Sequence, residues 1–192
     1  MATIFSYSFD EYVDLVKSFH GHVAPGVAIG GFMVDLAFKT LPAGIRFQAL
    51  CETPKCLPDA VQLLTSCTAG NGRLKIVNFG RYALTLYENQ AGKGVRVSVS
   101  PKKLEPWSEI QTWFYKRKPK KDQGFDLLMS QVRKAESTLF DVQKVRVAQS
   151  FTTTKRRGAF AICPRCHESY PADDGEICLG CKDEATYGTG KA

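Results

Sequence analysis

The segment Phe19-His-Gly-His-Val-Ala-Pro-Gly26 separates two predicted helices and is part of the most informative region of the sequence. The segment Ser8-Phe-Asp-Glu11 before it is a capping box, which predicts the start of a helix. Gly21 is a typical helix stop, and Pro25 suits the first turn of a second helix that runs to about Lys39. We therefore expect two helices joined by a short turn, with a histidine on each side of the glycine stop.

A second stretch, from Cys51 to Gly70, places a cysteine at each end of another predicted helix. Cys56 comes just before this helix, which we expect over residues 57–66, and Cys67 follows it. Imidazole and thiolate are ligands that zinc and its neighbours prefer. The spacing matches no compact zinc finger, so the fold would have to assemble a site from separate elements.

Four residues of these two stretches are the candidates for a functional core pocket: His20, His22, Cys56 and Cys67. His20 has a simpler alternative role, which is to donate to the last carbonyls of its own helix. The N-terminus of a helix would lower the pKa of the Cys56 thiol, whereas Cys51 is interpreted as a buried apolar residue of a strand. Glu52 and Asp59 are candidates for proton transfer or simple helix caps.

The rest of the N-terminal region mixes strands and helices. We predict strands at 45–51, 73–78, 82–88, 95–99 and 144–151, and helices at 107–117 and 124–140. These elements follow no regular βαβ period. The predicted class is therefore α+β, with a mixed core of helices and antiparallel sheet plus a small C-terminal zinc finger.

The finger is predicted from two C-x2-C pairs separated by eleven residues: Cys163, Cys166, Cys178 and Cys181. Two such pairs complete a tetrahedral Zn(Cys)4 site, which is structural because it leaves no open position. A module of about thirty residues cannot build an adequate apolar core, so zinc would supply much of its folding free energy. The alternative is a redox-active dithiol pair.

These patterns divide the chain into four parts. We expect a core domain at 1–151, a basic linker at 152–158, the zinc-finger module at 159–185 and a disordered tail at 186–192. No apolar stretch is long enough to span a membrane. Seven cysteines in a chain without a secretory signal favour metal ligation over disulfides, so we expect a cytoplasmic protein.

The net charge of +7 suits contact with an acidic partner. Between residues 102 and 121, lysines and an arginine surround several aromatic residues, including Trp107 and Trp113. This composition predicts either a surface on which nucleic-acid bases stack or a solvated helix face whose aromatic side chains pack inward.

Taken together, the two stretches resemble the FmdE family, which is named after a component of formylmethanofuran dehydrogenase. The hallmark of that family is F-H-G-H-x-x-P-G, which appears here at Phe19–Gly26. It continues as E-T-x-x-C-x-x-D-A-x-Q-x-L-T-x-C-T-x-G-x-G, which appears at Glu52–Gly72. The resemblance spans roughly residues 8 to 100, and many members also carry the C-terminal zinc module.

The resemblance implies an α+β core that is often dimeric and a treble-clef-type zinc finger. It also implies a core metal pocket that draws on His20 or His22, Cys56 and Cys67, with zinc as the second metal. The family is associated with the molybdenum or tungsten enzyme that reduces carbon dioxide onto methanofuran in methanogenesis. Many members have cysteine where this chain has Ala24, and glycine is common at the position of Ser66.

Three functions follow as hypotheses. The first is a zinc-binding accessory or partner-binding component linked to one-carbon metabolism, which forms a homodimer and contacts a redox enzyme complex. The second is a metalloenzyme with an open position on its core metal. The third is a nucleic-acid-binding protein that uses the finger and the basic surface.

Overall fold

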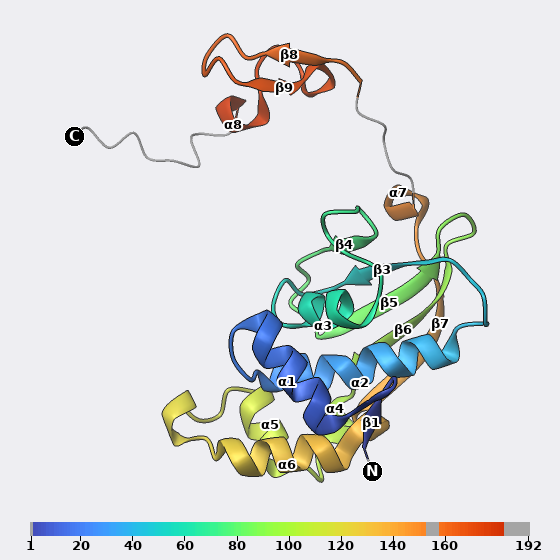
Figure 1. Ribbon diagram of the computed structural model, residues 1–192, viewed down its shortest axis with the longest axis vertical. Coiled ribbons are helices and arrows are strands. Elements are labelled where there is room, and N and C mark those ends of the chain that lie inside the picture. Colours follow the sequence, from blue (N-terminus) through green and yellow to red (C-terminus); the bar gives the residue numbers. More distant parts are fainter. Residues whose placement is uncertain (1, 153–157, 183–192) are drawn as a thin grey trace. The chain divides into compact units, whose positions relative to one another are not determined.

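Helix α2 (Pro25–Thr40) forms the centre of the N-terminal part of the chain (Figure 1). The computed structural model describes residues 2–152 and 158–182, and the chain divides into two compact units, residues 1–152 and 153–192. Eleven of the sixteen residues of α2 are buried, so this helix needs neighbours all round. It packs against α1 (Phe9–His20), α3 (Leu57–Leu64), α6 (Phe125–Ala135) and a sheet.

The predicted capping box at the start of α1 is present. Ser8 Oγ accepts from the backbone N–H of Glu11, and the Glu11 carboxylate accepts from the N–H of Ser8 at 2.7 Å. Further along, α1 and α2 approach so closely that a Cβ atom on Gly31 would lie 2.4 Å from the Tyr12 ring. Tyr12 is fully buried and donates to the carbonyl of Val27 at 3.0 Å, so its ring has a fixed place.

A five-stranded sheet covers one side of α2, with strand order β4-β3-β5-β6-β7. The strands are β3 (Phe47–Cys51), β4 (Leu74–Ile76), β5 (Ala83–Glu88), β6 (Lys93–Val99) and β7 (Phe140–Arg146). β3 and β4 run parallel, whereas the other neighbouring strands run antiparallel. The row Ala49, Leu86 and Val95 is in register and belongs to the core. This confirms the predicted α+β class.

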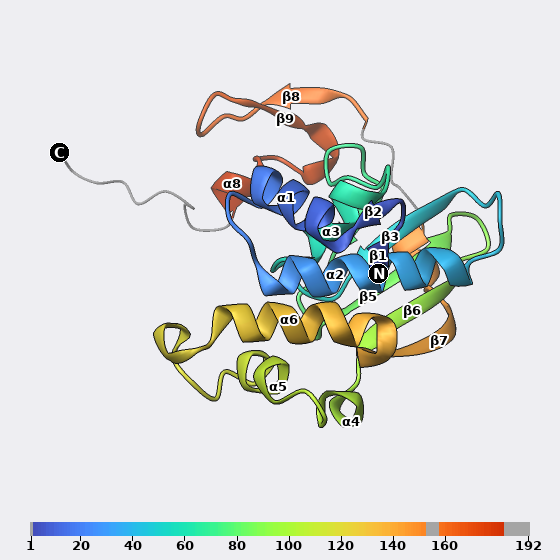
Figure 2. The ribbon, with the colours of Figure 1, turned by 60° about the horizontal axis from the view of Figure 1, so that its bottom comes forward.

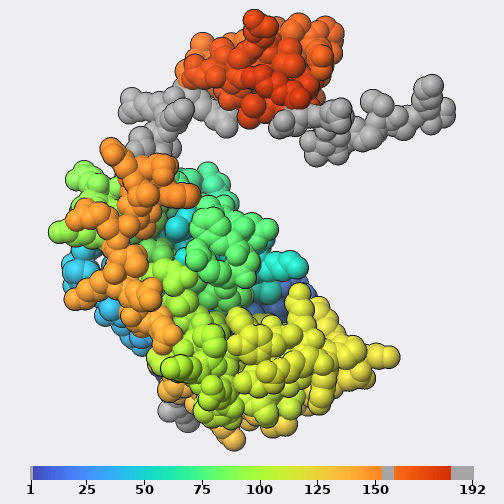
Figure 3. Space-filling view, turned by 180° about the vertical axis from the view of Figure 1, so that it is seen from behind, coloured from blue at the N-terminus to red at the C-terminus, as the bar shows by residue number. Residues whose placement is uncertain are grey.

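Shorter elements complete the N-terminal unit. Strands β1 (Thr3–Ile4) and β2 (Tyr7–Ser8) form a hairpin before α1, and α4 (Pro101–Leu104) and α5 (Ser108–Phe114) follow β6. α5 lies beside α6, which in turn lies beside α2 (Figure 2). The segment between α5 and α6, with a 3-10 turn at Lys120–Asp122, projects from the unit (Figure 3).

No single helix in residues 2–152 or 158–182 is long and apolar enough to cross a membrane. α1 and α2 meet the length and composition criterion only as a pair, and this pair is bent by 119°.

The structure corrects two predicted boundaries near the end of the unit. The helix predicted at 124–140 ends at Ala135 and is followed by a 3-10 turn, Glu136–Leu139, and the strand predicted at 144–151 lies instead at Phe140–Arg146. Every residue of β7 has a partner on β6, so pairing with the neighbouring strand determines where β7 runs. Gln149–Thr152 form the short helix α7.

The C-terminal unit is described over residues 158–182. β8 (Phe160–Ile162) pairs antiparallel with β9 (Ser169–Pro171), and a 3-10 turn at Ala172–Asp174 leads toward α8 (Leu179–Lys182). Most of the predicted linker and all of the predicted tail lie outside the described residues.

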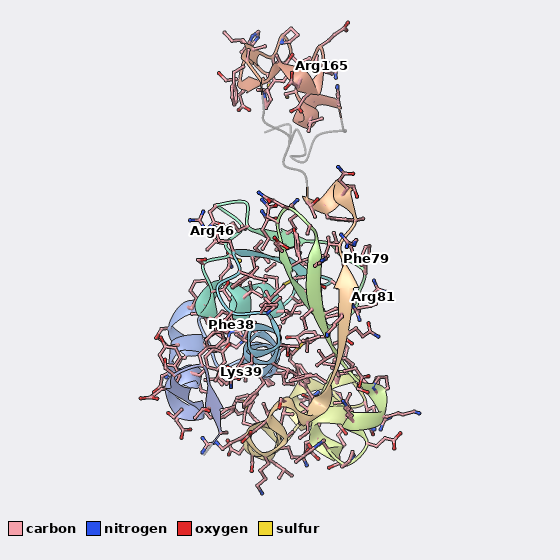
Figure 4. The ribbon with its side chains drawn as sticks, turned by 90° about the vertical axis from the view of Figure 1, so that its right-hand side faces the viewer. Phe38, Lys39, Arg46, Phe79, Arg81 and Arg165 are labelled. Carbon is pink, nitrogen blue, oxygen red and sulfur yellow. The ribbon has the colours of Figure 1, made fainter. Side chains whose placement is uncertain are left out.

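A buried carboxylate, that of Glu52, is held at the end of β3 by two arginines. Glu52 is 4% exposed, and its oxygens lie 2.6 Å from Nε of Arg96 and 2.6 Å from Nε of Arg81. Arg81 also lies over the ring of Phe79, 4.9 Å from its centroid (Figure 4). Burial alone would raise the pKa of Glu52, but Arg96 and then Arg81 hold the pKa below its ordinary value.

We expect Arg96→Met to lower the free energy of unfolding by about 1–2 kcal/mol at neutral pH, because the buried carboxylate keeps only one, more exposed, partner. Urea unfolding measures the loss. Because the pKa of Glu52 is lowered in the folded state, the ion pair stabilises above about pH 4.5 and its contribution falls as the solution is acidified. The matched control is Lys144→Met on exposed β7, for which a change within about 0.5 kcal/mol is expected. Equal losses in both variants would contradict the role of Arg96.

Candidate functional site

A cavity of about 570 Å³ opens where the end of α1 meets the starts of α2 and α3. Four polar side chains from these elements line it: His20, His22, Cys56 and Asp59. The other wall comes from the distant α5–α6 region and includes Trp113, Lys120, Gln123 and Phe125. The volume is in the range of sites that bind small molecules.

Asp59 fixes the orientation of His20 in this pocket. Nδ1 of His20, the last residue of α1, lies 2.5 Å from Oδ2 of Asp59 in the first turn of α3. In a neutral imidazole, a carboxylate on Nδ1 favours the tautomer that carries its proton there, which leaves the lone pair on Nε2. The ring of His22 lies beside it, with 4.8 Å between the ring centroids. His20 therefore bonds to Asp59 through its Nδ1, and not to helix carbonyls as the simpler alternative role would require.

Cys56 reaches the pocket from an unusual backbone conformation. Its φ is 59° and its ψ is −51°, and the N–H of Leu57 donates to the carbonyl of Lys55 at 2.6 Å, which makes a γ-turn with positive φ. A Cβ atom on Gly26 would lie 3.0 Å from the Cys56 sulfur, so the glycine leaves room for it.

The predicted lowering of the Cys56 pKa is wrong. Burial raises the pKa of this thiol and the charge of Asp59 adds to the rise, while Lys120 and Lys55 oppose it. The position of Cys56 just before α3 therefore does not give it a lowered pKa, because desolvation by burial is the largest contribution.

The structure does not bring Cys67 to the pocket. Cys67 lies beyond the opposite end of α3, where it is fully buried and its sulfur donates to the carbonyl of Phe47 at 3.6 Å. Glu52 is also absent from the lining, because its carboxylate is bound by the two arginines. Cys51 is the buried strand residue that the sequence predicts, and burial raises its pKa to about 12.

Several residues that line the pocket are not among the candidates that the sequence indicates. Lys55 stands inside the second motif between two candidate residues, and Gln123 and Phe125 follow the basic run. Composition marks Trp113 and Lys120 only as parts of a basic and aromatic surface. The segment that holds them is far from the motifs along the chain, so no local pattern connects it with His20.

The four C-terminal cysteines form the metal site of the second unit. Their sulfur atoms all lie within 4.8 Å of one another, and those of Cys166 and Cys178 are 3.7 Å apart. Backbone hydrogen bonds from Cys166 and Cys178 lower the pKa of Cys163 to about 6, which favours its thiolate. Among the described residues, the His, Cys, Asp and Glu side chains of the core form no group this tight. The finger cysteines therefore fit a tetrahedral zinc ion.

Comparisons with known proteins agree with both units. Residues 19–148 match the family model described as FmdE, molybdenum formylmethanofuran dehydrogenase operon, and residues 154–188 match the FmdE treble clef zinc finger. The crystal structure of a tungsten formylmethanofuran dehydrogenase FmdE-like protein from Syntrophus aciditrophicus is similar to this chain. The two share 47% identity with a TM-score of 0.88, over 96% of this chain and 97% of that one.

A probable S-adenosyl-L-methionine-binding protein from Archaeoglobus fulgidus is 36% identical over 99 residues. The match covers 47% of this chain but only 27% of that relative, so the chain spans about a quarter of its length. The first family model alone covers more than half of the chain. The protein therefore belongs to the FmdE family and carries the treble clef zinc finger of that family.

Proposed function

We propose that this zinc-finger protein is an accessory, partner-binding component that holds a second metal ion, zinc, in its core pocket. The ligands would be Nε2 of His20, a ring nitrogen of His22 and the sulfur of Cys56. The observation that carries the proposal is the 2.5 Å contact between Asp59 and Nδ1 of His20. A carboxylate behind a histidine is the usual outer partner of a metal-binding imidazole, because it fixes the tautomer and increases the basicity of the free nitrogen.

The chain's own residues prepare this pocket. Gly26 leaves space for the sulfur of Cys56, and the γ-turn directs that sulfur to the lining. Because burial raises the pKa of Cys56, the thiol would release its proton only when a cation binds. Ala24 lines the pocket at the position where many relatives supply a cysteine, so the protein offers three ligands there.

Metal analysis tests the proposal. We expect two zinc equivalents per chain, and His22→Ala or Cys56→Ser should remove one of them while the finger keeps the other. Asp59→Asn should weaken the core site by about 10- to 100-fold, as outer-shell changes do. Cys67→Ser is the matched control and should keep both equivalents, because Cys67 lies outside the pocket. A single equivalent in the unaltered protein would contradict the core site.

A metalloenzyme is the second candidate. Three protein ligands beside a cavity of about 570 Å³ would leave one coordination position for water or substrate. This alternative requires an exchangeable ligand on the core metal, and a carboxylate other than Glu52 would have to move protons, because Glu52 is bound by Arg96 and Arg81.

The basic surface gives less support to nucleic-acid binding. Trp107, Trp113 and Phe114 pack against the hydrophobic core, whereas Tyr115 is exposed beside Arg117. The homodimer, the contact with a redox enzyme complex and the cytoplasmic location rest on the family resemblance and on composition, and they stay predictions.

A further inference from the structure

The rim of the core pocket carries two lysines that no carboxylate neutralises. Lys55 lies in the γ-turn region before α3, and Lys120 lies in the projecting segment between α5 and α6. Within the described part of the chain, neither ammonium group forms a salt bridge, while the one acidic lining residue, Asp59, is bound to His20. The pocket therefore presents a net positive charge at its mouth.

Both lysines face the same cavity. Lys55 and Lys120 line it together with Cys56, from opposite walls of the pocket. A charge at the mouth of a cleft with low-dielectric walls attracts ligands of opposite sign more strongly than the same charge on a flat surface. An anion that enters the cavity would therefore approach two cations at once.

The wall next to Lys120 is apolar and partly aromatic. Trp113 is partly buried against the core, Phe125 is 45% exposed at the start of α6, and Leu128 is buried one turn further on. An exposed phenylalanine and a tryptophan that line one cavity offer flat surfaces to a planar group. Gln123, which also lines the cavity, adds a neutral hydrogen-bonding side chain.

We propose that the pocket binds an anionic small molecule with a flat apolar body, an organic carboxylate or phosphate. Lys55 and Lys120 bind the anionic group, and Trp113 and Phe125 pack against the body. The proposal uses the pocket of the proposed function, but it depends on the lysines and not on the core metal.

Calorimetric titration with matched probes tests this ligand class. The probes are 2-naphthoate, 2-naphthyl phosphate and the uncharged 2-naphthamide, and comparing the two anions decides between carboxylate and phosphate. We expect the preferred anion to bind about tenfold more tightly than the amide, and this preference should shrink with added salt. Equal affinities for anion and amide, or no binding of any probe at millimolar concentration, would overturn the proposal.

Single substitutions test whether the two lysines at the rim supply the charge that binds the anion. Lys55→Met and Lys120→Met should each weaken binding of the anion by about two- to fivefold and leave the amide unchanged. Lys118→Met, in the same basic segment but outside the lining, is the control and should change neither. An equal loss in the control would mean that general charge, and not the pocket, attracts the anion.

The His22→Ala variant separates this proposal from the proposed function. If the His22→Ala protein loses the core metal, and adding Lys120→Met to it still weakens anion binding, both proposals stand. If the lysine effect disappears with the metal, the anion binds the metal and the lysine proposal fails. If the unaltered protein holds one zinc equivalent yet shows the lysine effect, the core metal site fails and the anion site stands.

Discussion

Removal of zinc should unfold the C-terminal unit and leave the N-terminal unit folded. The described part of the finger buries few apolar side chains, since Phe160 is 67% exposed, Ile162 72% and Leu179 51%. Binding of zinc by four thiolates is worth about 10–16 kcal/mol in small fingers, which exceeds anything this apolar surface could contribute. The core, by contrast, is built on the buried helix α2 and its sheet.

Cys166→Ser tests this expectation without a chelator. In a nitrogen–proton correlation spectrum, the signals of residues 158–182 should collapse to the narrow range of an unfolded chain while the core signals stay in place. His167→Asn is the matched control, because residue 167 has a φ of 61° that asparagine tolerates and lies outside the four-sulfur group. A finger that stays folded in Cys166→Ser would show that protein packing, not zinc, holds it together.

Gly31→Ala should destabilise the N-terminal unit by about 3 kcal/mol, because the added methyl group would lie 2.4 Å from the ring of Tyr12. The sign of the effect is informative. In an unobstructed helix, alanine is favoured over glycine by about 1 kcal/mol, so a loss of stability means that the steric cost exceeds this gain. Tyr12 cannot move aside easily, since it is fully buried and bonded to Val27.

Urea unfolding at constant pH measures this loss. Gly70→Ala is the control, because a Cβ atom there meets nothing within 4 Å and the backbone has no positive φ. Since α1 carries His20 at its end, a displaced α1 should also weaken metal binding at the proposed core site. Unchanged or higher stability in Gly31→Ala would show that α1 and α2 can separate at little cost.

The parts of the structure that could be predicted depend on short-range interactions. Ser8 and Glu11 cap a helix over one turn, and the finger cysteines pair over three residues, so the sequence alone specifies them. The start of β7 could not be predicted, because it depends on pairing with β6. Helix boundaries placed Cys56 and Cys67 at the two ends of α3, and a rise of 1.5 Å per residue separates the ends of this eight-residue helix by about 12 Å, so the absence of Cys67 from the pocket could have been predicted.

The pocket wall formed by Trp113, Lys120 and Phe125 was unpredictable for a similar reason. These residues line the same cavity as His20, and the contacts of α6 with α2 and of α5 with α6 join segments far apart in the chain. Composition indicated a basic and aromatic segment, but it contained no information about which face of the core the segment would cover.

The γ-turn at Cys56 has a consequence for how this protein can change by mutation. A side chain in this conformation costs about 1–3 kcal/mol, out of the 5–15 kcal/mol by which a typical domain is stable. Glycine is the residue that would relax the turn, yet glycine would remove the sulfur from the pocket. Selection for stability and selection for the thiol therefore act in opposite directions at one codon. A lineage that no longer needed the pocket would have a short path to a more stable protein.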